Sequence, residues 1–67
     1  MEMKVMHTRH NQGIHVELVE LLPAHEFFIR VHDDASDEGF ESVATSDGKL
    51  AMDMFRHPFA YRLNTAA

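Results

Sequence analysis

The sequence predicts an α+β domain, in which an antiparallel meander of three to four strands packs one face against an amphipathic helix. Two observations carry this prediction. Apolar and polar residues alternate over 14–18 and again over 27–32, which is the period of a half-buried strand. Over 47–57 the apolar residues instead recur every three or four positions, which is the period of a helix. At 67 residues the chain has room for a single small domain, 1–67.

The two central strands are expected at 14–22 and 25–33, with a turn around Pro23 and Ala24 between them. Proline fixes its own φ angle and has no N–H to donate, so it belongs in the turn. Either a two-residue or a four-residue loop with this centre gives the same register. That register places apolar residues opposite apolar ones and an acid opposite a base, in the pairs Leu18–Ile29, Val16–Val31, Glu17–Arg30 and His15–His32. Because a one-residue slip would turn every side chain to the wrong face, this agreement supports the pairing.

A first strand is expected at 3–10, followed by a three-residue turn, Asn11-Gln12-Gly13, in which glycine suits the left-handed position. This turn predicts the pairs Met6–Leu18, Thr8–Val16, His7–Glu17, Arg9–His15 and Val5–Val19. The surface under the helix would then consist of Met6, Thr8, Val16, Leu18, Ile29 and Val31.

The remaining elements follow from local signals. The acidic segment 33–39 predicts a loop, and 40–45 predicts a short fourth strand. Asp47 is placed to cap the helix expected at 47–57, because a carboxylate there accepts from the free N–H groups of the first turn. Residues 59–63 alternate again and allow a short fifth strand, with a further helical turn as the alternative.

Composition excludes several classes of function. Eleven acidic and six basic residues give a formal net charge of −5 with histidine neutral, so direct binding to nucleic acid is not expected. The absence of cysteine excludes disulfides and thiolate metal sites and fits a cytoplasmic location. The sequence contains no apolar run long enough for a membrane span and no signal peptide, so no membrane association is expected.

Histidines on the polar face of the sheet are the sharpest candidate for chemistry. The predicted register gathers four side chains that suit Zn²⁺ or Ni²⁺, namely His7, His15, Glu17 and His32. Arg9 and Arg30 fall among them, and a cation beside a metal is unfavourable. We therefore expect no metal and no other cofactor, and keep a histidine-based metal-binding module as an alternative function. Protonating these crowded histidines should lower stability between about pH 7 and pH 5.

The preferred function is a non-enzymatic protein-interaction or regulatory module that acts through an acidic surface. The carboxylates of the acidic loop would form this surface, through Asp33, Asp34, Asp37 and Glu38. No catalytic residues are expected, because neither a nucleophile–histidine–acid pattern nor a glycine-rich phosphate loop is present in the sequence. A second alternative is an acidic nucleic-acid mimic that inhibits a DNA-binding protein.

The predicted register also places large apolar side chains on the sheet face that the helix does not cover. They are Met3, Val5, Val19, Leu21 and Phe28. An exposed apolar cluster of this size usually marks an interface, and a short chain gains stability by burying it. The sequence therefore predicts a weak homodimer formed across a two-fold axis.

Overall fold

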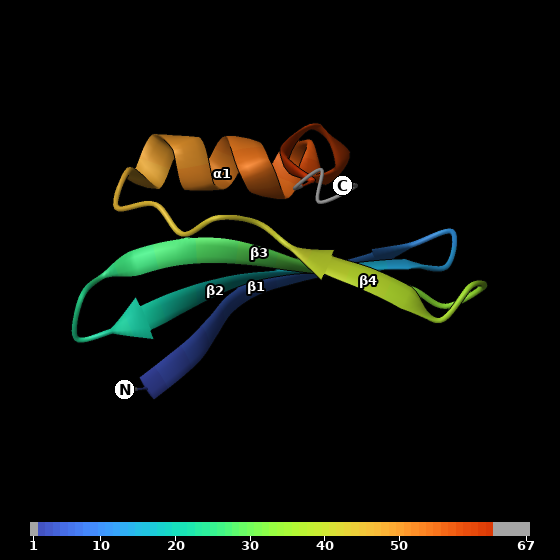
Figure 1. The fold of residues 1–67 in the computed structure, drawn as a ribbon, viewed down its shortest axis with the longest axis horizontal. Coiled ribbons are helices and arrows are strands. Elements are labelled where there is room, and N and C mark those ends of the chain that lie inside the picture. The colour runs from blue at the N-terminus through green and yellow to red at the C-terminus, as the bar shows by residue number, and fades with distance from the viewer. Residues whose placement is uncertain (1, 63–67) are drawn as a thin grey trace, which may run out of the picture.

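The computed structural model describes residues 2–62 and confirms the α+β fold. Four antiparallel strands form one sheet in chain order, and a helix followed by a 3₁₀ turn packs over one face of it (Figure 1). The elements are β1 (Glu2–Asn11), β2 (Ile14–Leu22), β3 (Glu26–Asp33), β4 (Glu38–Glu41), α1 (Gly48–Arg56) and η1 (Pro58–Tyr61). Neither helix in this part of the chain is long and apolar enough to cross a membrane.

The central hairpin has the predicted register. All four expected pairs between β2 and β3 are present: Leu18–Ile29, Val16–Val31, Glu17–Arg30 and His15–His32. The last pair before the turn is Leu21–Glu26, so the connection is the four-residue alternative, 22–25. Within it, His25 has a positive φ of 54°.

One face of the sheet, here called the helix face, carries the core. Val16, Leu18, Ile29 and Val31 on this face are buried against two apolar residues of α1, Ala51 and Met54. The helix begins where predicted, because the Asp47 carboxylate accepts from the backbone N–H groups of Lys49 at 2.9 Å and Leu50 at 3.3 Å. These two bonds satisfy donors that the first turn of a helix leaves without partners.

The pairing of β1 with β2 differs from the prediction near the turn. The connection has two residues, Gln12 and Gly13, with φ angles of 52° and 79°, as a type I′ turn requires. The second half of β1 is therefore shifted by one residue, giving the pairs His7–Leu18, Thr8–Glu17, Arg9–Val16 and His10–His15. An irregularity between Val5 and His7 restores the predicted pair Val5–Val19. An extra residue in one strand is a β-bulge. Because side chains alternate between the two faces of a sheet, the residues beyond the bulge point to the opposite face from the one that unbroken alternation would give.

The shifted register changes which side chains in the second half of β1 meet the helix. His7 and Arg9 lie on the helix face, where Met6 and Thr8 were wrongly expected. The His7 and Phe55 rings are 5.9 Å apart, and the Arg9 guanidinium carbon lies 4.9 Å from the centre of the Phe55 ring. Arg9 also donates to the Phe55 carbonyl at 2.7 Å, which satisfies an acceptor in the last turn of α1.

The fourth strand is shorter and earlier than predicted. β4 ends at Glu41, where 40–45 was expected to be a strand. At the next residue, Ser42, a side chain takes over the role of the backbone acceptor. The Ser42 hydroxyl accepts from the Ile29 N–H at 2.9 Å. The Ser42 backbone N–H still donates to the Ile29 carbonyl at 3.0 Å, and the next bridge to β3 is the isolated pair Phe27–Thr45.

The segment after α1 is a helical turn, and the alternative of a fifth strand over 59–63 is wrong for the residues described. Residue 63 lies outside them. Pro58 occupies the first position of η1, where its fixed φ angle suits a helix start and its missing N–H costs nothing. At the end of η1, the Tyr61 hydroxyl donates to the Asp53 carboxylate of α1.

This contact gives a prediction for alkaline pH. The hydrogen bond to Asp53 raises the pKa of Tyr61 above the ordinary tyrosine value, and desolvation and the carboxylate charge raise it further. A raised pKa means that the contact stabilises the fold below the ordinary value and that this contribution is lost as the pH rises through the folded-state pKa.

Tyr61 is the only tyrosine and the chain has no tryptophan, so tyrosinate absorbance reports on this group alone. We expect Asp53→Ala to move the titration midpoint down towards the ordinary value. An unchanged midpoint would show that Asp53 does not cause the raised pKa.

Candidate functional site

The predicted metal-ligand group is divided between the two faces of the sheet. His7 turns to the helix face, while His15, Glu17 and His32 stay on the opposite face, here called the open face. Including His7 in this group was therefore wrong, because the first turn has two residues and not three, which places His7 opposite Leu18 on the helix face. Within residues 2–62, no three His, Asp or Glu side chains lie close enough together to hold a metal ion.

His10 takes the place of His7 on the open face. It pairs with His15, which pairs with His32, so one row of histidines crosses β1, β2 and β3. The His10 and His15 rings lie 5.7 Å apart. The sequence prediction missed His10 because it gave the first turn three residues. The Gln12-Gly13 dipeptide was the signal for a two-residue turn, which places His10 opposite His15.

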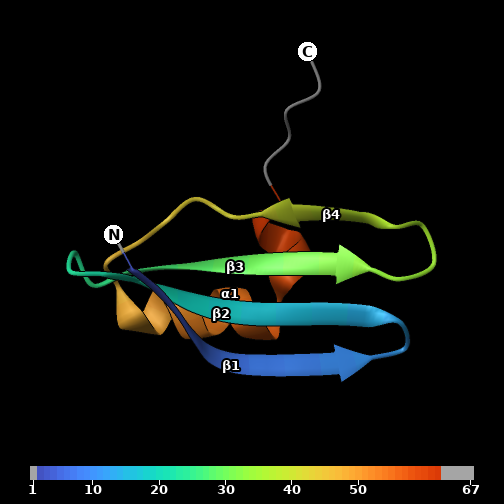
Figure 2. The ribbon, with the colours of Figure 1, turned by 90° about the horizontal axis from the view of Figure 1, so that it is seen from below.

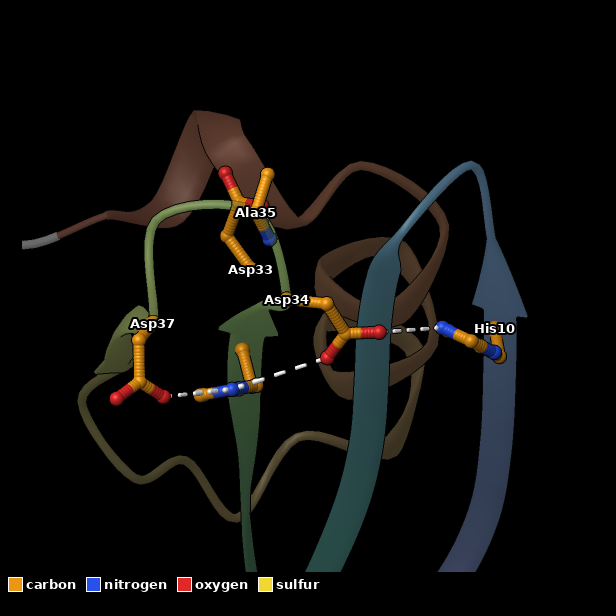
Figure 3. Close-up of polar contacts among 6 residues, drawn as sticks. His10, Asp33, Asp34, Ala35 and Asp37 are labelled. Carbon is orange, nitrogen blue, oxygen red and sulfur yellow. Dashed lines mark hydrogen bonds and ion pairs between the residues drawn. The ribbon is translucent and has the colours of Figure 1, made fainter.

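The acidic loop packs against this histidine row. A backbone hydrogen bond joins the loop to the first turn, since the Asp34 N–H donates to the Gly13 carbonyl at 2.9 Å. The Asp34 carboxylate then reaches across β2 to the Nε2 atom of His10 at 3.0 Å (Figure 3). On the other side, His32 Nε2 lies 3.8 Å from Asp34 Oδ1 and 3.4 Å from Asp37 Oδ1. The result is a chain of alternating imidazoles and carboxylates that joins β1, β3 and the loop.

Local hydrogen bonds hold the loop in this shape. The Asp33 carboxylate accepts from the Ala35 N–H at 3.0 Å, and the Asp33 carbonyl accepts from the Asp37 N–H at 2.8 Å. Asp37 has a positive φ of 56°, a conformation that aspartate tolerates better than most residues. Its side chain is 94% exposed. The loop therefore exposes the Asp37 side chain to solvent, whereas the Asp33 carboxylate is bound by a backbone N–H of the loop itself.

Beside the loop, the open face is hollowed. An open concavity of about 710 Å³ crosses β2, β3 and β4, and it is lined by His15, Glu17, Arg30, Val31, His32, Gly39, Phe40 and Glu41. Glu17 accepts from Arg30 Nε at 2.8 Å, so the charge of this arginine is already compensated. Glu41 is exposed opposite Arg30 on the adjacent strand.

The hollow and the loop make this end of the sheet acidic on both faces, and we call it the acidic end. It contains six carboxylates: Glu17, Asp33, Asp34, Asp37, Glu38 and Glu41. Two basic side chains accompany them, Arg30 in the hollow and Arg62 beside Asp33 and Glu38 on the helix side. With histidine neutral, these groups leave a local charge of −4, and most of them are at least partly exposed.

The predicted interface cluster is not exposed as a whole. Val19 and Phe28 are 0% and 8% exposed, and Leu21 is partly buried. Figures 1 and 2 show the reason, because the sheet coils so that the first half of β1 curves beneath β2 on the open face. Only Met3 and Val5 remain largely exposed, at 60% and 45%. The expectation of five exposed apolar side chains was therefore wrong, and self-association stays a prediction.

Comparison of the chain with protein-family models, with curated proteins and with solved structures found no match to any of them.

Proposed function

We propose that this protein is a non-enzymatic interaction module that binds a Lys- and Arg-rich segment of a partner protein at the acidic end. The observation that supports it is the position of the hollow directly beside the acidic loop, at the uncovered end of the open face. The concavity offers room for an extended segment, and the carboxylates on this side, Glu17 and Glu41 in the hollow and Asp34 and Asp37 beside it, attract positive side chains. A cytoplasmic location remains part of the proposal.

Two exposed carboxylates are best placed to contact such a segment. Asp37 extends from the loop with its side chain 94% exposed, and Glu41 stands exposed in the hollow. Glu17 lies deeper and is paired with Arg30, so it contributes to the local field more than to direct contact. Recognition by exposed charges is expected to be weak to moderate, fast, and sensitive to salt.

The alternative of a nucleic-acid mimic uses the same surface but demands a DNA-binding partner. Arg30 and Arg62 interrupt the row of carboxylates, so the described residues do not favour phosphate mimicry over a general basic partner. The metal-binding alternative receives no support from residues 2–62, as described above.

Calorimetry with a short peptide of alternating glycine, lysine and arginine, blocked at both ends, tests the proposal at low salt and about pH 8. The variant Asp37→Asn/Glu41→Gln removes two charges with little change of shape, and asparagine tolerates the positive φ at 37. Each exposed ion pair contributes about 0.2–1 kcal/mol, so loss of two pairs should lower the affinity by about twofold to thirtyfold.

The matched control is Glu2→Gln/Glu26→Gln, which makes the same change in net charge at the other end of the sheet. It should bind the peptide nearly as tightly as the wild-type protein. Equal losses in the two double variants would show that the peptide responds to net charge and not to the acidic end. No measurable binding by the wild-type protein would refute the proposed function.

A further inference from the structure

The acidic end contains its own set of groups that change charge near neutral pH. His10, His15 and His32 form one row, and two of them contact the loop carboxylates directly. Histidine is the side chain whose ordinary titration falls between about pH 5 and 8, whereas Asp, Glu and Arg keep their charges across that range. A change of pH within this range therefore acts on the charge of histidine side chains, whereas carboxylates stay ionised.

The contacts fix what protonation does at this surface. Asp34 lies between His10, at 3.0 Å, and His32, at 3.8 Å, and Asp37 lies 3.4 Å from His32. When these imidazoles are neutral, the two carboxylates keep their full negative charge towards solvent. When the imidazoles are protonated, each becomes a cation beside the carboxylate that a basic partner would otherwise contact.

The other charged groups around the row do not cancel this effect. From β2 and β3, Glu17 and Arg30 form a closed pair, and from β4, Glu41 stands opposite Arg30. Arg9 of β1 points to the helix face and is bound to α1. Protonating the three histidines therefore moves the local charge of the acidic end from −4 to −1.

We propose that His10, His15 and His32 make the acidic end a proton-sensitive binding surface, which holds a basic segment at neutral and higher pH and releases it on mild acidification. This inference depends on the proposed function, since it concerns the same surface. The loop itself stays in place at low pH, because protonation turns its hydrogen bond to His10 and its close contacts with His32 into ion pairs. The expected drop in stability on acidification assumed that His7, His15 and His32 share a face with Arg9 and Arg30. His7 and Arg9 lie on the helix face, so for the open face it stays a prediction that concerns His15, His32 and Arg30.

The test measures binding of the same blocked peptide at about pH 8 and about pH 5.5, at constant ionic strength. The peptide contains no group that titrates in this range, so a change in affinity belongs to the protein. For the wild-type protein we expect affinity to fall about tenfold at the lower pH. In His10→Gln/His32→Gln, which keeps hydrogen-bonding side chains, the fall should be less than about threefold.

The chain provides a matched control at the opposite end of the sheet. His25 contacts Glu20 at 3.0 Å, the same distance as His10 to Asp34, but far from the hollow along the strands. His25→Gln should keep the full pH dependence of the wild-type protein. The single variants His10→Gln and His32→Gln alter the loop less than the double variant does. Each should remove part of the pH dependence of binding.

The outcomes separate the two proposals. A wild-type protein that fails to bind the peptide at about pH 8 refutes the proposed function and, with it, this inference. Binding that is equally tight at both pH values refutes only the proton sensitivity. Unchanged pH dependence in His10→Gln/His32→Gln, or its loss in His25→Gln, assigns the effect to other groups and overturns the role of this row.

Discussion

Replacing Ile29 with alanine is expected to remove a large share of the free energy of unfolding at room temperature. Ile29 is fully buried at the centre of β3, in contact with the core formed by the helix face and α1. Truncating a buried isoleucine to alanine costs about 2–5 kcal/mol, through lost apolar contact and the cavity left behind. Domains of this length have a total stability of roughly 3–10 kcal/mol, so this one substitution removes much of it.

Urea denaturation followed by circular dichroism measures the effect. Ile29→Val, which removes a single methylene, should cost only about 0.5–1.5 kcal/mol. Val43→Ala makes the second control, because Val43 is 63% exposed and its truncation should change stability by no more than about 0.5 kcal/mol. If Ile29→Ala and Val43→Ala lowered the free energy of unfolding equally, the core would not lie between β3 and α1.

The second large effect is expected at Gly39, which pairs with His32 where β4 runs beside β3. A Cβ atom built on Gly39 would lie 2.4 Å from the backbone carbonyl oxygen of Val31. That oxygen belongs to the strand and cannot move aside as a flexible side chain would, so β4 must separate from β3. We expect Gly39→Ala to cost about 1–3 kcal/mol and to weaken peptide binding, because Gly39 and Glu41 line the hollow.

Gly48→Ala provides the matched control for this substitution. Gly48 is the first residue of α1, and an added Cβ there meets no heavy atom within 4 Å. Because alanine favours the helix more than glycine does, the variant should be neutral or more stable by up to about 1 kcal/mol. A Gly39→Ala protein with wild-type stability and binding would show that β4 does not pack against β3 as described.

The elements with strong periodicity were predictable from the sequence. The β2–β3 register followed from two features acting together. One is the proline in the turn, and the other is that a single register pairs apolar Leu18 with Ile29 and acidic Glu17 with basic Arg30. The helix followed from its apolar spacing and from Asp47 as its cap. In each case local preference and packing demanded the same structure, which is when sequence reasoning is most dependable.

The register of β1 was not predictable in the same way. His7 and Arg9 were assigned to the wrong face because the first turn was given three residues instead of two. Val5 paired correctly only because a bulge between Val5 and His7, which has no marker in the local alternation, shifts the register back. The error then passed to the candidate site, where it replaced His10 by His7.

The acidic loop was predicted as a surface, but its contacts were not. The sequence indicated that Asp34 and Asp37 would be exposed and negative. That both would lie against histidines depends on two turns meeting at one end of the sheet, through the bond from Asp34 to Gly13. Such a long-range meeting of loops leaves no periodic signal in the sequence.

Mapping the amide shifts of the isotopically labelled protein during addition of the blocked basic peptide tests most directly whether the acidic end binds a basic segment. At about pH 8 the largest changes are expected in the loop at Asp34 and Asp37 and in the hollow at His15, His32 and Glu41. Little change should occur at Glu2, at Glu26 or along α1. Shifts spread evenly over the surface, or concentrated at the opposite end of the sheet, would contradict the proposed binding surface.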